Sequence, residues 1–208
     1  MFELIRSGGW VMWPLIACSI GALAIIGERF WTLQKKYVTP SGLLEEVRGL
    51  LARHELDEQR LQQLRDGSPL GRVLAAGLVN RSHPRIVIKE AIEDAGRHVA
   101  PDLERYLRTL GTIAAISPFL GLLGTVLGMI DMFAGIGRAG VGDPSIVASG
   151  ISQALIATAS GLIVAIPSLM FYRFFRGRVN ELLVEMEKQA IALVEILKGE
   201  REQEAGAP

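Results

Sequence analysis

The side chains that could do chemistry in this chain are hydroxyl and amide groups set in apolar, uncharged stretches. Thr125 lies in residues 118–128, PFLGLLGTVLG, and Gln153 and Thr158 lie in residues 151–161, ISQALIATASG. Such groups can hydrogen-bond to an ion, to water or to another helix, but they do not carry a proton at physiological pH. No Asp, Glu, Lys or His lies in the middle of these stretches. If ions cross a membrane here, another chain must supply the titratable group.

Other kinds of chemistry have little support in the sequence. The single cysteine, Cys18, and the three widely separated histidines, His54, His83 and His98, form no metal-ligand motif. The apolar stretches hold no nucleophile, acid pair or metal set that an intramembrane enzyme would need. Lys and Arg balance Asp and Glu, 22 against 22, which argues against a nucleic-acid-binding protein. We therefore expect no enzyme activity, metal, cofactor or nucleic acid.

Three stretches without charged residues, 7–27, 109–130 and 144–172, are long enough to cross a membrane. A spanning helix needs roughly 20 mainly apolar residues, and backbone groups in lipid must be satisfied within the helix. We predict an all-α membrane protein with three transmembrane helices and long cytoplasmic helical extensions. Residues 15–18, LIAC, also fit a lipoprotein cleavage pattern, but the apolar run continues to Ile26. Cys18 is therefore expected to pack within the first span.

The predicted parts follow from these spans and their flanking charges. They are an outer N-terminus with the first span (1–34), a cytoplasmic helical segment (35–108), the second span (109–134), a short outer loop (135–144), the third span (145–175), and a cytoplasmic C-terminal helix and tail (176–208). Basic residues gather on one side: Arg29, Lys35, Lys36, Arg97, Arg105, Arg108, Arg173, Arg176 and Arg178. The other side has only Arg6 and Arg138, offset by Glu3, Asp131 and Asp143. An excess of Lys and Arg marks the cytoplasmic side, so the N-terminus is expected outside and the C-terminus inside.

Small residues form faces on the second and third spans. Pro118, Gly121, Thr125 and Gly128 share one narrow arc at about 100° per residue, and Gly124 pairs with Gly128 in a GxxxG motif. The third span carries a nearly continuous small face: Gly150, Ala154, Ala157, Thr158, Gly161 and Ala165. A polar group lies roughly opposite: Ser145, Ser149, Ser152, Gln153 and Ser160. Small faces permit close helix approach, and the third helix, with one small and one polar face, is expected to be enclosed by protein.

Two interpretations of the polar residues stay open. Thr125 faces another helix or a water-filled seam, or else its hydroxyl bonds the backbone of its own helix, which is frequent. The serines line a cavity, or else they make ordinary hydrogen bonds between helices.

The polar segments are expected to be helical as well. Leu43, Leu44, Val47, Leu50 and Leu51 recur at helical spacing, with breaks at residues 66–69 and 82–84. From Arg85 a helix is expected to continue into the second span, with a bend near Pro101. Beyond the third span a heptad seam is predicted at Val179, Leu183, Met186, Ala190, Leu193 and Leu197. The tail from Gly199 is polar and is expected to be disordered.

Two long motifs resemble one known family. Residues 110–133, LGTIAAISPFLGLLGTVLGMIDMF, and residues 151–167, ISQALIATASGLIVAIP, resemble the second-helix and third-helix signatures of the MotA/TolQ/ExbB proton-channel family. Glu28 and Arg29 match a weaker family feature. The layout with three spans and a large cytoplasmic loop is most similar to the ExbB and TolQ branch, because MotA has four spans.

The resemblance implies a ring of subunits, pentameric, around the single membrane helices of an ExbD- or TolR-like partner whose aspartate takes up protons. By motif position, the family's pore threonines correspond to Thr125 and Thr158, and its helix prolines to Pro118 and Pro167. Gln153 stands where ExbB and TolQ often have a glutamate, and an amide cannot carry a proton.

The implied function is that of a proton-channel stator subunit in a bacterial inner membrane motor. Together with an envelope-spanning TonB- or TolA-like protein, it would energise outer-membrane transport. The alternative is a passive membrane scaffold whose ring only holds a partner.

Overall fold

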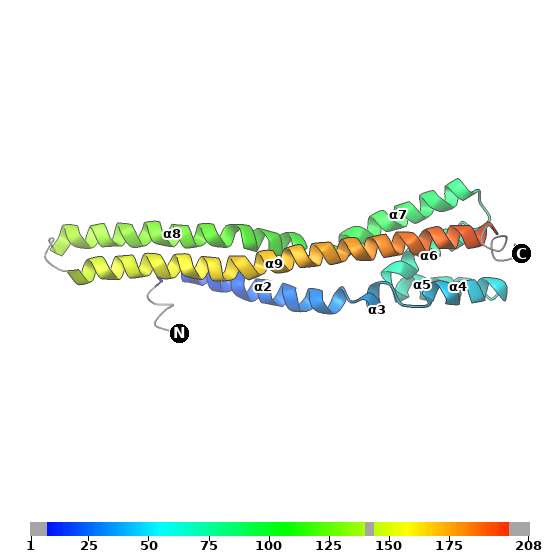
Figure 1. Ribbon diagram of the computed structural model, residues 1–208, viewed down its shortest axis with the longest axis horizontal. Helices are drawn as coiled ribbons and strands as arrows, with labels where there is room; N and C mark the ends of the chain where they lie inside the picture. Colours follow the sequence, from blue (N-terminus) through cyan, green and yellow to red (C-terminus); the bar gives the residue numbers. More distant parts are fainter. Residues whose placement is uncertain (1–7, 140–143, 200–208) are drawn as a thin grey trace, which may run out of the picture. The chain divides into compact units, whose positions relative to one another are not determined.

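The computed structural model describes residues 8–139 and 144–199, and every regular element in these residues is a helix. In chain order they are α2 (Met12–Thr32), α3 (Lys35–Val38), α4 (Leu43–Ala52), α5 (Glu58–Gly67), α6 (Pro69–Val79), α7 (Arg85–Leu103), α8 (Leu107–Ala139) and α9 (Pro144–Leu197) (Figure 1). The all-α prediction is therefore confirmed for the described part of the chain. Glu3, Arg6 and Asp143, the side chain of Arg138, and the tail beyond Gly199 lie outside the described residues.

Among the described residues, three helices are long and apolar enough to cross a membrane, as the charge-free stretches predict. These spans are Met12–Thr32, Leu107–Gly137 and Val147–Leu197. α2, with 21 residues, rises about 32 Å, close to the roughly 30 Å hydrocarbon thickness of a bilayer. α9 has 54 residues, far more than a membrane requires, so its C-terminal part extends beyond the apolar stretch.

The chain divides into two compact units, and α2 and α9 each contribute to both. The first unit comprises the described residues of Met1–Glu28 and Tyr106–Phe174. In it α8 and α9 run side by side (Figure 1), and the start of α2 packs on α8. Val11, Met12 and Leu15 are buried there against Leu120 and Leu127. Both span prolines, Pro118 and Pro167, lie inside helices that continue past them.

The second unit comprises the described residues of Arg29–Arg105 and Phe175–Pro208, and its short helices have definite start signals. Asp57 caps α5 by accepting a hydrogen bond from the Arg60 backbone N–H at 2.7 Å. Ser68 caps α6 in the same way, with Pro69 at the first helical position. The two breaks predicted around residues 66–69 and 82–84 are both present.

The expectation of one continuous helix from Arg85 into the second span is wrong. α7 ends at Leu103, three residues beyond it are not helical, and α8 begins at Leu107. Tyr106 has φ of 61°, in the left-handed region that a right-handed helix cannot include. The chain therefore turns here, and Pro101 ends up in the last turn of α7, where the helix is already finishing.

The heptad seam predicted on the C-terminal part of α9 is present in part, because Leu183 and Leu197 are only half-buried. Of the predicted residues, Val179, Met186, Ala190 and Leu193 are buried, and Leu182, Ala192 and Val194 are buried as well. Leu182 takes the inward place predicted for Leu183, which is half-buried. Within the same unit, Leu193 lies against α6, since a methyl group added to Gly77 would be 3.2 Å from a Leu193 methyl carbon.

Arg29 is buried in the second unit although the sequence marks it as a flanking surface charge. Its side chain is 4% exposed, and its Nη1 donates to the Leu103 carbonyl at 3.1 Å. Leu103 is the last residue of α7, so the guanidinium satisfies a carbonyl at a helix C-terminus, where positive charge is favourable. Next to it, Phe30 packs edge-on against Phe175 with ring centroids 5.0 Å apart.

Candidate functional site

The glycines of α8 bring its backbone against the backbone of α9. A methyl group added at Gly121 would lie 3.0 Å from the Ala157 carbonyl oxygen and 3.1 Å from the Thr158 Cα. A methyl group at Gly124 would collide with the Ala157 Cβ. Ala157 itself is fully buried. A side chain at either position would push the neighbouring helix away, so glycine is what allows the two helices to approach this closely.

The same close contact continues toward both ends of the pair. A methyl group at Gly128 would be 3.0 Å from the Gly150 carbonyl oxygen, and one at Gly161 would be 2.6 Å from the Ser117 carbonyl oxygen. We call this contact the α8–α9 seam and define it by Gly121, Gly124, Gly128, Gly150, Ala154, Ala157 and Gly161. The glycines singled out by spacing in the sequence thus meet across one continuous interface.

The two threonines differ in how their hydroxyls are held. Thr125 Oγ1 donates to the Leu122 carbonyl at 2.7 Å, a short bond within its own helix. Of the two interpretations open for Thr125, the single chain therefore favours the bond to its own backbone. Thr158 Oγ1 instead reaches across the seam to the Gly121 carbonyl, but at 3.5 Å, the long limit of a hydrogen bond. The half-buried Thr158 hydroxyl is thus only weakly engaged.

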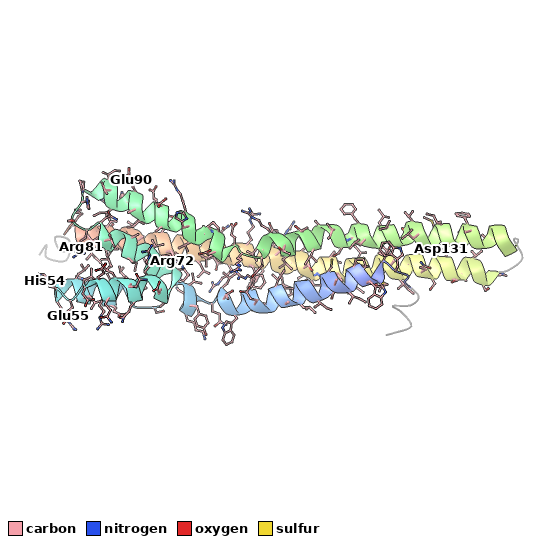
Figure 2. The ribbon with its side chains drawn as sticks, turned by 180° about the vertical axis from the view of Figure 1, so that it is seen from behind. His54, Glu55, Arg72, Arg81, Glu90 and Asp131 are labelled. Atoms are coloured by element: carbon pink, nitrogen blue, oxygen red, sulfur yellow. The ribbon has the colours of Figure 1, made fainter. Side chains whose placement is uncertain are left out.

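Gln153 lies in a different part of the first unit from this threonine contact. Its side chain covers the segment before α2, because a methyl group added at Gly9 would be 2.6 Å from the Gln153 Nε2. It also lines a groove of about 320 Å³ together with Asp131, Ser145 and Ser149. Figure 2 shows Asp131 on α8, one of the few ionisable side chains of the first unit. The groove can hold water and polar groups, and a carboxylate and an amide face it from two helices.

Two serines that the sequence reasoning does not single out are buried beside the span prolines. Ser117, before Pro118, donates to the Ile113 carbonyl at 2.7 Å. Ser168, after Pro167, donates to the Val164 carbonyl at 2.7 Å. Both hydroxyls are therefore satisfied within their own helices, and neither needs an ion or a partner chain to explain it.

The centre of the seam carries no ionisable side chain among the described residues. The charged side chains described in the first unit are Glu28, Arg108, Asp131 and Arg173, and none of them lies within residues 117–128 of α8 or residues 150–161 of α9. In the described part of the chain no group of His, Cys, Asp and Glu side chains could hold a metal ion. What the seam offers is therefore hydrogen bonding without proton exchange.

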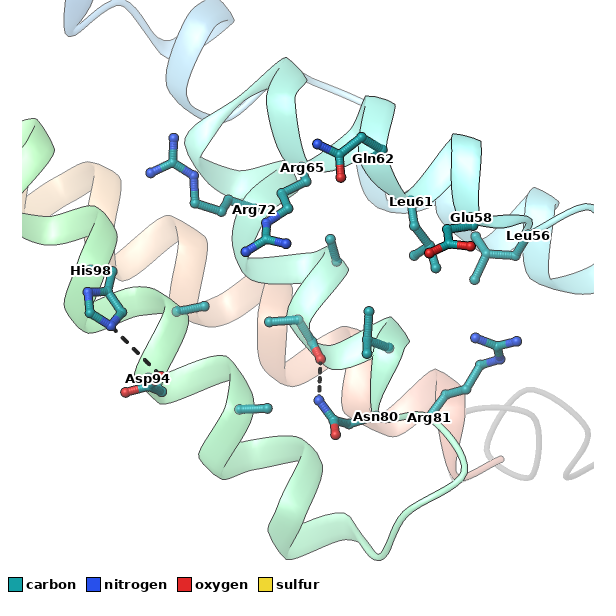
Figure 3. Close-up of a pocket in the computed structure, with 15 residues that line it drawn as sticks. Leu56, Glu58, Leu61, Gln62, Arg65, Arg72, Asn80, Arg81, Asp94 and His98 are labelled. Carbon is teal, nitrogen blue, oxygen red and sulfur yellow. Dashed lines mark hydrogen bonds and ion pairs between the residues drawn. The ribbon is translucent and has the colours of Figure 1, made fainter.

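The second unit holds a wider pocket that contains none of the predicted site residues. This cavity of about 750 Å³ lies between α5, α6 and α7 (Figure 3). Its lining includes three arginines, Arg65, Arg72 and Arg81, together with several alanines. Arg72 also forms an ion pair with Asp102 at 2.9 Å. Its side chains bring together no nucleophile with a base and no ligand set, so it gives no sign of catalysis.

Comparison with known proteins gives a consistent picture. The model of the MotA/TolQ/ExbB proton channel family matches residues 65–188. A biopolymer transport protein ExbB-like 3 from Synechocystis is 33% identical over 174 residues, covering 82% of each chain. The biopolymer transport protein ExbB of Salmonella typhimurium is 31% identical over 186 residues, covering 82% of this chain and 73% of its own. The Tol-Pal system protein TolQ of Haemophilus influenzae is 40% identical over 105 residues, covering 49% of this chain and 46% of its own.

Proposed function

Because the chain belongs to the MotA/TolQ/ExbB proton channel family, we propose that it is the stator subunit of a proton-driven inner-membrane motor. The proposal extends the plainer conclusion that the chain is a membrane subunit of an energising complex. The motor would convert proton motive force into work at the cell envelope, namely the energising of outer-membrane transport. The observation that carries the proposal is a closely packed pair of membrane helices whose centre has hydroxyls but no ionisable group among the described residues.

Because the centre of the helix pair carries no charged side chain among the described residues, the proposal requires a second chain. We propose a pentameric ring of this subunit around an ExbD- or TolR-like protein with a single membrane helix bearing an aspartate. That aspartate would take up and release the proton, which the hydroxyls of Thr125 and Thr158 cannot do. An envelope-spanning TonB- or TolA-like protein would receive the motion. Charge segregation supports an orientation with the N-terminus periplasmic and the C-terminus cytoplasmic.

The ion path in this proposal runs past Thr158, Thr125 and Gln153. The Thr158 hydroxyl is held by a weaker hydrogen bond than the Thr125 hydroxyl, since its distance to the Gly121 carbonyl is 3.5 Å. It can therefore turn toward water or the partner's carboxyl group at little cost. Gln153 would contribute hydrogen bonds near the groove that it shares with Asp131. Protons are favoured over sodium because few oxygen ligands suited to sodium lie in the spans.

Replacing Thr158 with valine tests this role, because valine keeps the shape and removes only the hydroxyl. The assay is proton flux into proteoliposomes that contain the subunit and its co-purified partner, followed with a trapped pH-sensitive dye under an imposed potential. Thr158→Val should abolish the flux. Thr112→Val is the matched control, because it makes the same change at an exposed threonine whose hydroxyl bonds its own helix, at 2.9 Å to the Arg108 carbonyl. That control should conduct like the unaltered protein.

Assembly must be measured on the same samples to separate the two candidate functions. Native mass spectrometry should show the same ring and partner stoichiometry in the Thr158→Val variant as in the unaltered protein. Flux that persists in a correctly assembled Thr158→Val complex would refute the channel role. An unaltered complex that assembles but never conducts protons would point to the passive scaffold instead.

A further inference from the structure

Two aromatic rings and a lysine form an exposed cluster at the C-terminal end of α2 and in the turn that follows it. The rings of Trp31 and Tyr37 lie with centroids 6.1 Å apart, tilted by 32°. The Lys36 Nζ sits 4.7 Å from the Tyr37 centroid and 5.7 Å from the Trp31 centroid. Trp31 is 63% exposed and Tyr37 is 42% exposed. We call Trp31, Lys36 and Tyr37 the aromatic–lysine cluster.

Buried neighbours hold this cluster in a defined conformation. Leu33 and Val38, on either side of the exposed residues, are 4% and 1% exposed, and Thr39 is fully buried. The Gln34 carbonyl accepts backbone hydrogen bonds from both Tyr37 and Val38, at 3.0 and 3.2 Å. The turn is therefore anchored from within the second unit, and its outward side presents the cluster as a preformed surface.

The surroundings of the cluster are positive. Between Glu28 and Glu45 the chain contains Arg29, Lys35 and Lys36 and no acidic residue. Arg29 is buried against the end of α7, so the two lysines, both exposed, are the cations left at the surface. α3 packs near α6, whose sequence PLGRVLAAGLV has Arg72 as its one charged residue. A negatively charged ligand at the cluster would thus meet cations, and no carboxylate, from α3 and α6.

The position of the cluster selects the kind of ligand. Trp31 is the penultimate residue of a membrane-spanning helix, so it lies where the hydrocarbon ends and the headgroups begin. Tryptophan and tyrosine favour this level because their rings are apolar and their N–H and O–H groups are polar. A free phosphate ion would use the ammonium groups but would leave two exposed ring faces without a partner. A phospholipid can use both.

We propose that the aromatic–lysine cluster, with Lys35, binds the headgroup of an anionic phospholipid in the leaflet at the inner end of α2. The lipid phosphate oxygens would accept hydrogen bonds from the two lysine ammonium groups and from the Tyr37 hydroxyl. The Trp31 ring face would lie against the glycerol and the first acyl carbons. Cation–π contact keeps the Lys36 ammonium over the rings, ready for the phosphate.

Tryptophan fluorescence tests the site directly. In the full-length chain, Trp10→Phe and Trp13→Phe together leave Trp31 as the one tryptophan. The protein is reconstituted in phosphatidylcholine vesicles that contain either brominated phosphatidylglycerol or brominated phosphatidylcholine, and bromine quenches only a neighbouring ring. Each lysine near an anionic surface contributes about fivefold in binding, so Trp31 should show a roughly 5- to 25-fold preference for the anionic lipid.

Substitutions of single lysines test which residues give Trp31 its preference for the anionic lipid. Lys36→Gln should lower it about fivefold, and Lys35→Gln with Lys36→Gln should remove it. Lys89→Gln, at an exposed position on α7, should leave it unchanged. The complementary reporter, Trp10→Phe with Trp31→Phe, leaves Trp13 near the other end of α2 and should show little preference between the two lipids.

Three results would overturn the proposal. Equal quenching of Trp31 by both lipids, or an anionic preference that survives loss of both lysines, would show that the cluster does not read lipid charge. Displacement of brominated phosphatidylglycerol by millimolar inorganic phosphate at constant ionic strength would identify a free-phosphate site instead. The quenching measurement does not depend on ion conduction, so failure of the lipid proposal and failure of the proposed motor function can be told apart.

Discussion

Adding one methyl group at Gly124 should destabilise the chain, and removing one from the facing residue should restore it. The methyl group of Gly124→Ala would collide with the Ala157 Cβ, on a residue that is fully buried. The other nearby atoms, the Ala157 Cα at 3.7 Å and the Val11 Cβ at 3.9 Å, are at ordinary contact distance. One side-chain atom is therefore responsible for the whole conflict.

The magnitude follows from the packing. Inserting a methyl group into a close-packed interface costs about 1–3 kcal/mol. The better helix propensity of alanine returns up to about 1 kcal/mol, so Gly124→Ala, whose collision lies at the upper end of that range, should cost about 2 kcal/mol net. Ala157→Gly alone loses a buried methyl group and some helix propensity, again about 1–2 kcal/mol. In the double variant the new methyl group occupies the space of the old one, and stability should return to within about 1 kcal/mol of the unaltered chain.

The assay is reversible unfolding in detergent micelles, followed by far-ultraviolet circular dichroism. Gly177→Ala on α9 is the control for helix propensity, because an added methyl group there meets nothing within 4 Å. Gly161→Ala is the control for rescue. Its methyl group would lie 2.6 Å from the Ser117 carbonyl oxygen, a backbone atom that no substitution removes. Purely additive free energies for Gly124→Ala and Ala157→Gly would refute the side-by-side contact of α8 and α9 described above.

Two further predictions concern the second unit. Arg29→Gln should lower stability by about 2–3 kcal/mol, because it removes a buried charged donor and leaves the Leu103 carbonyl without it; an unchanged unfolding midpoint would contradict this. Ser68→Ala should lower stability by about 1 kcal/mol, because the hydroxyl caps α6 by accepting from the Gly71 N–H at 3.0 Å. Thermal unfolding measures both, and Ser82→Ala, at an exposed position between α6 and α7, should leave the midpoint unchanged.

The elements that the sequence predicts well are those governed by local rules. Charge-free runs of membrane length give three spans because lipid admits no unsatisfied backbone. The break before Pro69 is visible because a serine followed by proline is a helix start. The faces of small residues meet in the structure because side-chain volume alone decides how closely two helices can approach.

The features that escape the sequence depend on contacts between distant residues. Arg29 counts as a surface charge by position, but it is buried because the end of α7, 74 residues away, offers a carbonyl to it. Tyr106 breaks a helix by adopting a left-handed conformation that its residue type does not favour. Trp31 and Tyr37 look like isolated aromatic residues, and only the turn held by Leu33 and Val38 brings Lys36 over their rings.

The packing of the α8–α9 seam limits where a proton path can lie. Ala154 and Ala157 are buried, and the glycines facing them have little space for even one methyl group. A chain of water molecules between α8 and α9 would need a continuous gap at least one water molecule wide, and these contacts leave no such gap. In the proposed motor, protons therefore travel along the outside of the helix pair, between it and a second chain. The helix pair would then line one side of the proton path, and the partner helix would supply both the other side and the titratable group.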